Sequence, residues 1–125
     1  MTMSTAAQAY ARVATTTASP RDIEAQALLK AANKLQDVLN SNEGRGDRLN
    51  DALMFNRKLW SIFVSEAMRD ENPQPRDVRQ NIANIGIFVL TQSAALQMQA
   101  TPEIGCLKSL IDINRNIAAG LSGRA

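Results

Sequence analysis

The chain has 125 residues, of which 45 % are apolar, 21 % are charged and 4 % are aromatic. This length predicts one domain that buries about two thirds of its unfolded surface, and the shortage of aromatic residues favours an aliphatic core such as helical bundles build. Fourteen Lys and Arg residues stand against twelve Asp and Glu residues, for a net charge of +2. Because the two signs alternate along the chain, the charge pattern does not favour direct binding of nucleic acid.

Residue types that catalysis and metal binding commonly use are scarce. The chain has no histidine, and Cys106 is its single cysteine, so a zinc site or an internal disulfide is not expected. Gly44-Arg45-Gly46 lacks the spacing of a phosphate-binding loop and is expected to form a turn, while Asp70-Glu71 is expected to be solvated. We therefore predict that the protein is not an enzyme and holds no cofactor and no metal.

The sequence also predicts a cytoplasmic protein that makes no contact with a membrane. The N-terminus has no basic segment followed by an apolar run, and the densest apolar stretch, Ile85 to Leu90, is far shorter than the ~20 residues that span a bilayer. A single Cys106 fits a reducing compartment, where a buried thiol behaves as a small hydrophobe.

Helical spacing of apolar residues recurs almost everywhere, which predicts an all-α fold. Residues 4–16, with Tyr10 and Val13, form a short candidate helix that is marginal alone, so residues 1–18 are expected to dock loosely. Ser19 before Pro20 places a capping hydroxyl ahead of a proline, and predicts a helix from Pro20 to about Ser41. Its expected core stripe is Leu28, Ala31, Leu35, Val38 and Leu39.

Three more helices follow in the sequence. Asp47 is the expected cap of the third helix, Pro75 is expected to open the fourth, and Thr101-Pro102-Glu103 is expected to start the fifth. The expected core stripe of the third helix is Leu49, Ala52, Leu53, Asn56, Trp60, Phe63, Val64 and Ala67. That of the fifth is Ile104, Leu107, Leu110, Ile111, Asn114, Ala118 and Leu121. Residues 1–125 are thus predicted to form one small bundle of about five helices.

Two helices carry more apolar surface than one core contact needs. In the third, a second arc lies about 90° or more from the core stripe. The fourth has apolar residues on opposite sides, so it is either the central helix of the bundle or one side forms a groove for a partner's amphipathic helix. The predicted partner-binding residues are Phe55, Leu59, Ile62, Ile87, Leu90 and Met98.

Polar residues within these helices give further predictions. Asn56 and Asn114 lie in apolar stripes and need hydrogen-bond partners, such as a helix end, a loop carbonyl or one another. Arg57 and Arg115 are expected at the rim, paired with carboxylates such as Asp51 or Asp112. Gly86 permits close approach of another helix.

Three segments carry a resemblance to a known family. They are Phe55 to Phe63, Asn81-Ile82 with Ile85 to Val89, and Leu110 to Arg115 with Ile117 to Leu121. In these segments the chain resembles the FlaF family of flagellar biosynthesis regulators of alphaproteobacteria, with similarity from Ser19-Pro20-Arg21 through Leu121. It departs from the family pattern at Val78, where the family has leucine, and in the loop around Gly44.

The resemblance implies a protein that promotes flagellin synthesis and export, acting post-transcriptionally beside the opposing regulator FlbT and binding flagellin before secretion. The surplus apolar arcs fit a chaperone that covers a helical segment of an export substrate. Two alternatives remain open at this point: an RNA-binding regulator of flagellin mRNA translation, and a structural subunit that dimerises through the same arcs.

Overall fold

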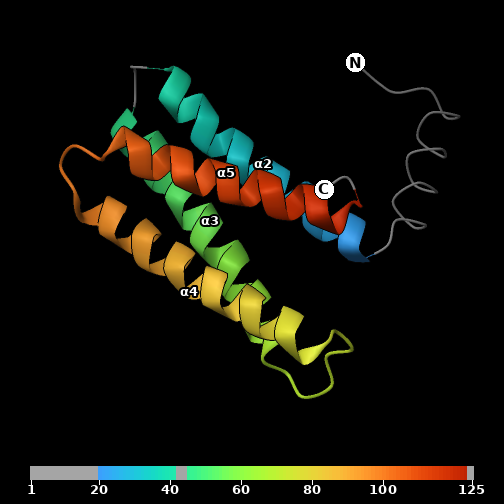
Figure 1. Ribbon diagram of the computed structural model, residues 1–125. Coiled ribbons are helices and arrows are strands. Elements are labelled where there is room, and N and C mark those ends of the chain that lie inside the picture. The colour runs from blue at the N-terminus through green and yellow to red at the C-terminus, as the bar shows by residue number, and fades with distance from the viewer. Residues whose placement is uncertain (1–19, 42–44, 124–125) are drawn as a thin grey trace, which may run out of the picture.

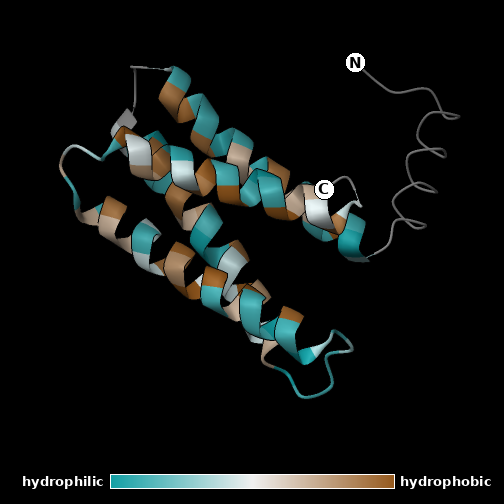
Figure 2. Cartoon of the chain, in the orientation of Figure 1, coloured by the Kyte–Doolittle hydropathy of each residue, from teal (hydrophilic) through white to brown (hydrophobic). Residues whose placement is uncertain are grey.

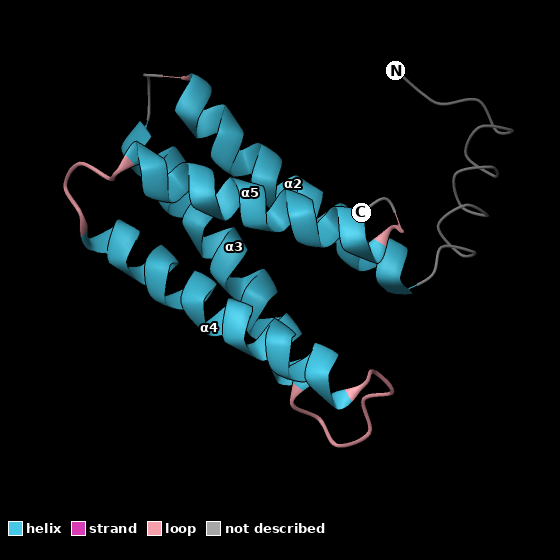
Figure 3. Ribbon diagram, viewed as in Figure 1, coloured by secondary structure: helices cyan, strands magenta, loops and turns pink. Residues whose placement is uncertain are grey.

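The computed structural model describes residues 20–41 and 45–123, which form four α-helices joined by short loops (Figure 3). They are α2 (Pro20–Asn40), α3 (Arg45–Ala67), α4 (Arg76–Met98) and α5 (Ile104–Leu121) (Figure 1). The predicted all-α class is confirmed. The first helix, predicted within residues 4–16, lies outside the described residues, as does Ser19, the predicted cap of α2.

The helix boundaries agree with the sequence predictions to within a few residues, with differences at three N-termini. Helix α4 begins at Arg76, so Pro75, the residue predicted to open it, is its N-cap residue. Helix α3 begins at Arg45, so Asp47 lies within its first turn, where a carboxylate is favoured by the helix dipole, and is not the cap. Helix α5 begins at Ile104, later than the predicted start at Pro102. Glu103 stays extended as its cap residue, and its backbone N–H donates to the side-chain Oε1 of Gln99 at 3.2 Å. Thr101 is therefore not the cap.

The helices pack in the order α5, α2, α3, α4, so that α2 and α3 lie in the middle and α4 and α5 are at the two ends. Helices α4 and α5 meet near the loop that joins them and then diverge along their lengths (Figure 1). The alternative in which α4 is the central helix is therefore wrong. Apolar residues nevertheless recur turn after turn along α4 and α5 (Figure 2), and part of that surface is left without a neighbouring helix.

Small residues bring α4 close to α3. Ala83, Gly86 and Ser93 are buried on the inner face of α4, and a Cβ at Gly86 would overlap Cγ2 of Val64 and lie 3.3 Å from Cε3 of Trp60. The predicted close approach at Gly86 is confirmed. The core itself is mostly aliphatic, as the composition predicts, and its largest fully buried side chains are Trp60, Leu28, Leu35, Leu53, Leu96, Leu110 and Ile111.

Polar side chains fix the packing register. Asn114 on α5 accepts a hydrogen bond from Trp60 Nε1 at 2.8 Å and donates from Nδ2 to Asn56 Oδ1 at 2.7 Å. All three side chains are buried. The two asparagines therefore bond to one another, one of the arrangements that the sequence left open, and link α3 to α5 across the core. The Nδ2 of Asn56 is buried without a hydrogen-bond partner.

The arginines beside these asparagines are engaged differently from the prediction. Arg57 donates to Gln97 Oε1 at 2.6 Å, and Arg115 donates to Gln36 Oε1 at 3.4 Å. Each arginine thus bonds to a glutamine side chain of a neighbouring helix, α4 for Arg57 and α2 for Arg115, and neither forms a salt bridge with Asp51 or Asp112.

Candidate functional site

The sequence-predicted partner residues divide into covered and exposed groups. Phe55 is half-buried, with the ammonium groups of Lys30 and Lys34 at 5.5 Å and 5.2 Å from its ring centroid. Leu59 and Leu90 are half-buried against the core. The other three are exposed: Ile62 by 59 %, Ile87 by 57 % and Met98 by 88 %.

These six residues do not form one surface. The ammonium groups of two α2 lysines lie over the ring of Phe55, so the second apolar arc of α3 faces α2 at this residue. On α4, successive residues are about 100° apart, so with Gly86 facing α3, Ile85 and Ile87 lie on opposite flanks of the helix. Ile85 is the one that faces α5, and Ile87 therefore points away from it.

The divergence of α4 from α5 creates a different apolar surface, which we call the α4–α5 groove. Its walls are Ile85 and Phe88 from α4 and Ile113 and Ile117 from α5, with Asn84 and Asn116 at its edge and a volume of about 420 Å³. Phe88 is 48 % exposed there. An aromatic ring left half in solvent beside isoleucines of two helices is typical of a surface that binds another apolar segment.

The groove continues into a second hollow between the start of α2, the end of α3 and the start of α4. We call it the basal pocket; it has a volume of about 280 Å³ and shares Ile117 with the groove. Its apolar lining is Trp60, Phe63, Val78, Ile82, Ile117 and Leu121. Trp60 and Phe63 meet edge to face at 5.4 Å between ring centroids, which gives this part of the lining a fixed shape.

Charged residues of both signs surround the basal pocket. Arg79 is held in place, since its guanidinium donates to the backbone carbonyls of Ala67 and Arg69, each at 2.7 Å. Glu24 is half-buried, and burial raises the pKa of its carboxyl; the positive charge of Arg21 lowers that pKa and the negative charge of Glu66 raises it further. Because burial raises the pKa of Glu24 more than Arg21 lowers it, the negative charge of this carboxylate is incompletely stabilised.

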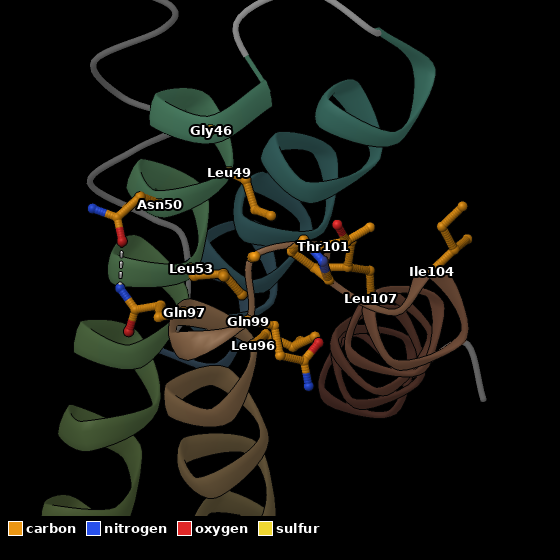
Figure 4. A pocket seen from close by; sticks show the side chains of 12 residues that line it. Gly46, Leu49, Asn50, Leu53, Leu96, Gln97, Gln99, Thr101, Ile104 and Leu107 are labelled. Carbon is orange, nitrogen blue, oxygen red and sulfur yellow. Dashed lines mark hydrogen bonds between the residues drawn. The ribbon is translucent and has the colours of Figure 1, made fainter.

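A third hollow lies at the opposite end of the bundle, beside the loop between α4 and α5 (Figure 4). The side chain of Gln97, on α4, forms two hydrogen bonds to α3 here. Its Nε2 donates to Asn50 Oδ1 at 2.8 Å, and its Oε1 accepts from Arg57. Leu49, Leu53, Leu96 and Leu107 close its base, and all four are buried core residues. The leucines that line this hollow already pack in the core, whereas Phe88 in the α4–α5 groove is half exposed. The groove is therefore the stronger candidate site.

Acidic side chains and Cys106 are the groups of the described residues that bear on metal binding and nucleophilic chemistry. No group of three or more acidic or cysteine side chains among residues 20–41 and 45–123 is placed to hold a metal ion. Cys106 is half-buried; the hydrogen bond that its Sγ donates to Glu103 Oε2 at 3.4 Å raises the thiol pKa, with smaller contributions from burial and from the negative charge of Glu103. A raised pKa keeps the thiol protonated and weakly nucleophilic.

None of the four described helices is both long enough and apolar enough to cross a membrane.

None of the six residues that the sequence predicts for partner binding lines the α4–α5 groove. The apolar residues that do line it are Ile85, Phe88, Ile113 and Ile117. The spacing of Ile113 and Ile117 by four residues marks a helical face, yet only the angle between α4 and α5 leaves that face uncovered.

Comparison with known proteins gives one family match. Neither the curated proteins nor the solved structures contain a significant match to the chain. A family model described as flagellar protein FlaF matches residues 6–121, which includes all four described helices. The match extends over nearly the whole sequence and includes the three segments that carry the resemblance, so the chain belongs to the FlaF family of flagellar proteins.

Proposed function

We propose that this protein binds flagellin through the α4–α5 groove and acts as a cytoplasmic chaperone and regulator that promotes flagellin synthesis and export. Membership of the FlaF family implies a role in flagellum biogenesis. The observation that carries the finer proposal is the groove, whose walls come from two helices that diverge. An apolar trough of this kind fits the apolar face of a single amphipathic helix.

The energetics allow such binding without any catalytic chemistry. Covering one side chain of the size of leucine or isoleucine contributes roughly 1.5 to 3 kcal/mol, so Phe88 and the half-buried isoleucines can supply several kcal/mol once association costs are met. A protein that works in this way is not an enzyme: it keeps an aggregation-prone helix of its substrate covered until export.

Regulation of flagellin synthesis could follow from the same site. In this scheme the protein is bound to flagellin when unexported flagellin is present and is free when it is absent. FlbT is a candidate partner that would distinguish the free form from the bound form. An RNA-binding mechanism is less well supported, because Arg79 and Arg57, two of the basic residues that could reach phosphates, are engaged with protein carbonyl groups.

Adjacent residues of α4 provide a matched test. Phe88 lines the groove and Ile87 lies on the opposite flank, yet the two are similarly exposed, at 48 % and 57 %. Phe88→Asp should abolish co-purification of flagellin from a co-expressing strain, while Ile87→Asp should retain it. Circular dichroism and thermal melts of both variants check that the fold is kept.

Two outcomes of this test would contradict the proposed site, and a separate measurement tests for a second copy. Loss of binding only in Ile87→Asp would move the flagellin site to the surface that the sequence predicted, with Ile87 and Met98. Normal binding by both variants would contradict a flagellin site on either side of α4. Light scattering of the free protein tests whether a second copy occupies the groove instead.

A further inference from the structure

The basal pocket lies where the described part of the chain begins. Pro20 and Arg21, the first two residues of α2, line this pocket together with Ile117 and Leu121 from the end of α5. Nineteen residues precede Pro20. Whatever position residues 1–19 take, they are tethered at the edge of the apolar surface described above, so their local concentration there is high, on the order of millimolar for a short flexible tether.

The sequence of this segment suits an apolar groove. Ala6, Tyr10 and Val13 recur at helical spacing. Arg12 is the only charged side chain among residues 1–19, and the segment has no acidic residue. The family match begins at residue 6, so the portion that carries Tyr10 and Val13 belongs to the family domain and is not an unrelated extension.

Dimensions and charge agree with docking in the groove. Residues 4–16 as a helix would measure about 20 Å, and the stretch of α4 from Val78 to Phe88, which runs along the basal pocket and the groove, measures about 15 Å. Residues 17–19 then connect the helix to Pro20, and three extended residues span about 10 Å. Arg12 would bring a positive charge near Glu24, whose carboxylate is half-buried at the rim and incompletely stabilised.

We propose that residues 4–16 of this chain dock in its own basal pocket and α4–α5 groove, with Tyr10 and Val13 against the apolar lining. The groove is then covered in the free protein by an intramolecular occupant that a partner must displace. Such an occupant would keep Phe88 and the isoleucines from promoting self-association while no partner is present.

The docking is tested in the full-length chain without any partner. Cys106→Ser removes the native thiol, and Gln8→Cys, on the polar side of the predicted segment, carries a nitroxide spin label. The methyl NMR signals of Ile82, Ile117 and Leu121, which line the pocket, should lose most of their intensity. Those of Ile87 and Met98, on the opposite flank, should be affected far less. The same experiment on Tyr10→Asp, in the labelled background, should restore the pocket signals.

Other results would overturn the proposal. Pocket methyl signals broadened no more than those of Ile87 would show that the segment does not dock there. Broadening that appears only between molecules, in a mixture of spin-labelled protein and isotope-labelled protein without a spin label, would assign the groove to a second copy. Broadening that persists in Tyr10→Asp would show that the apolar stripe of the segment does not cause the contact.

A functional consequence rests on the proposed binding of flagellin. If the segment covers the groove about nine-tenths of the time, Tyr10→Asp should bind flagellin about tenfold more tightly than the unmodified chain. Failure of this increase while the intramolecular broadening is present would count against the flagellin site in the groove and leave the docking itself supported. The two proposals can therefore fail separately.

Discussion

The indole Nε1 of Trp60 on α3 donates a hydrogen bond of 2.8 Å to Oδ1 of Asn114 on α5, although both side chains are almost completely buried. Asn114 also donates to Asn56, so a single amide satisfies two groups of α3. Trp60 occupies the space between α3 and α5 and lines the basal pocket. The hydrogen bond between Trp60 and Asn114 therefore contributes to the stability of the bundle and also fixes the position of one residue that lines the basal pocket.

Replacing Asn114 with leucine should destabilise the protein substantially. The change would leave Trp60 Nε1 and Asn56 Oδ1 buried without partners, each at a cost of about 1 to 3 kcal/mol, so we expect a loss of about 2 to 6 kcal/mol in the free energy of unfolding. Urea denaturation followed by circular dichroism measures it. Asn116→Leu, at an exposed position of the same helix, is the matched control and should change stability little. Equal effects of the two substitutions would contradict the role of the buried amide.

Gly86→Ala should destabilise the α3–α4 contact. Alanine favours a helix over glycine by about 1 kcal/mol, but its Cβ would overlap Val64, and overpacking typically costs about 1 to 3 kcal/mol. Gly105→Ala on α5, where no atom lies within 4 Å of the added Cβ, should be neutral or stabilising. The double variant Gly86→Ala, Val64→Ala should recover part of the loss, because the overlapping methyl group is then absent. Thermal melts of these variants, of Val64→Ala alone and of the unmodified chain decide the point, and additive losses in the double variant would refute the overlap.

Arg79→Gln should loosen the connection between α3 and α4. Its guanidinium joins the start of α4 to the carbonyls of Ala67 and Arg69, and hydrogen bonds that involve a charged group contribute about 1.5 to 3 kcal/mol when well formed. Because the site is partly exposed, we expect a loss near the lower figure. Hydrogen exchange should become faster in the turn from Arg69 to Gln74. Arg76→Gln, an exposed arginine one turn earlier, should leave exchange there unchanged.

Glu24→Gln should stabilise the protein at neutral pH and have less effect in acid. The folded-state pKa of Glu24 is raised above its ordinary value of 4.5, so the folded protein holds this proton more tightly than the unfolded chain. Stability therefore falls as pH rises through this range, and the unfavourable contribution is fully present above the raised pKa and absent well below 4.5. Melting temperatures of Glu24→Gln and the unmodified chain should converge as the pH is lowered.

Asp37→Asn, an exposed carboxylate later in α2, corrects for the general effect of removing a negative charge. A gain from Glu24→Gln that persists undiminished at low pH would show that burial of the charged form is not its cause.

The helices of this protein could be predicted from local signals. Proline at the start of α2 and before α4, glycine between α2 and α3, and the repeat of Leu28, Leu35 and Leu53 on inner faces are properties of short windows of sequence. The buried asparagine pair and the close approach at Gly86 were also predictable, since an amide or a glycine within an apolar stripe has few physical explanations.

The candidate site was less predictable, because exposure depends on neighbours far away in the sequence. Phe55 has the same apolar character as Phe88, yet lysines of α2 cover one while the other borders an open groove. Periodicity assigns a residue to a face of its helix, but it does not tell whether another helix covers that face.

By itself, therefore, the sequence determined the all-α class, the extents of the four described helices to within a few residues, the family, and most of the core stripes; Ile104, placed in the stripe of α5, is 49 % exposed. The tertiary structure decided that α4 lies at the edge of the bundle and that α4 and α5 diverge. The reason is one of packing: small residues of α4 hold it against α3, while Trp60 and its bond to Asn114 fill the space between α3 and α5. A helix angle of this kind arises from the joint fit of side chains on several helices, which no single stretch of sequence encodes.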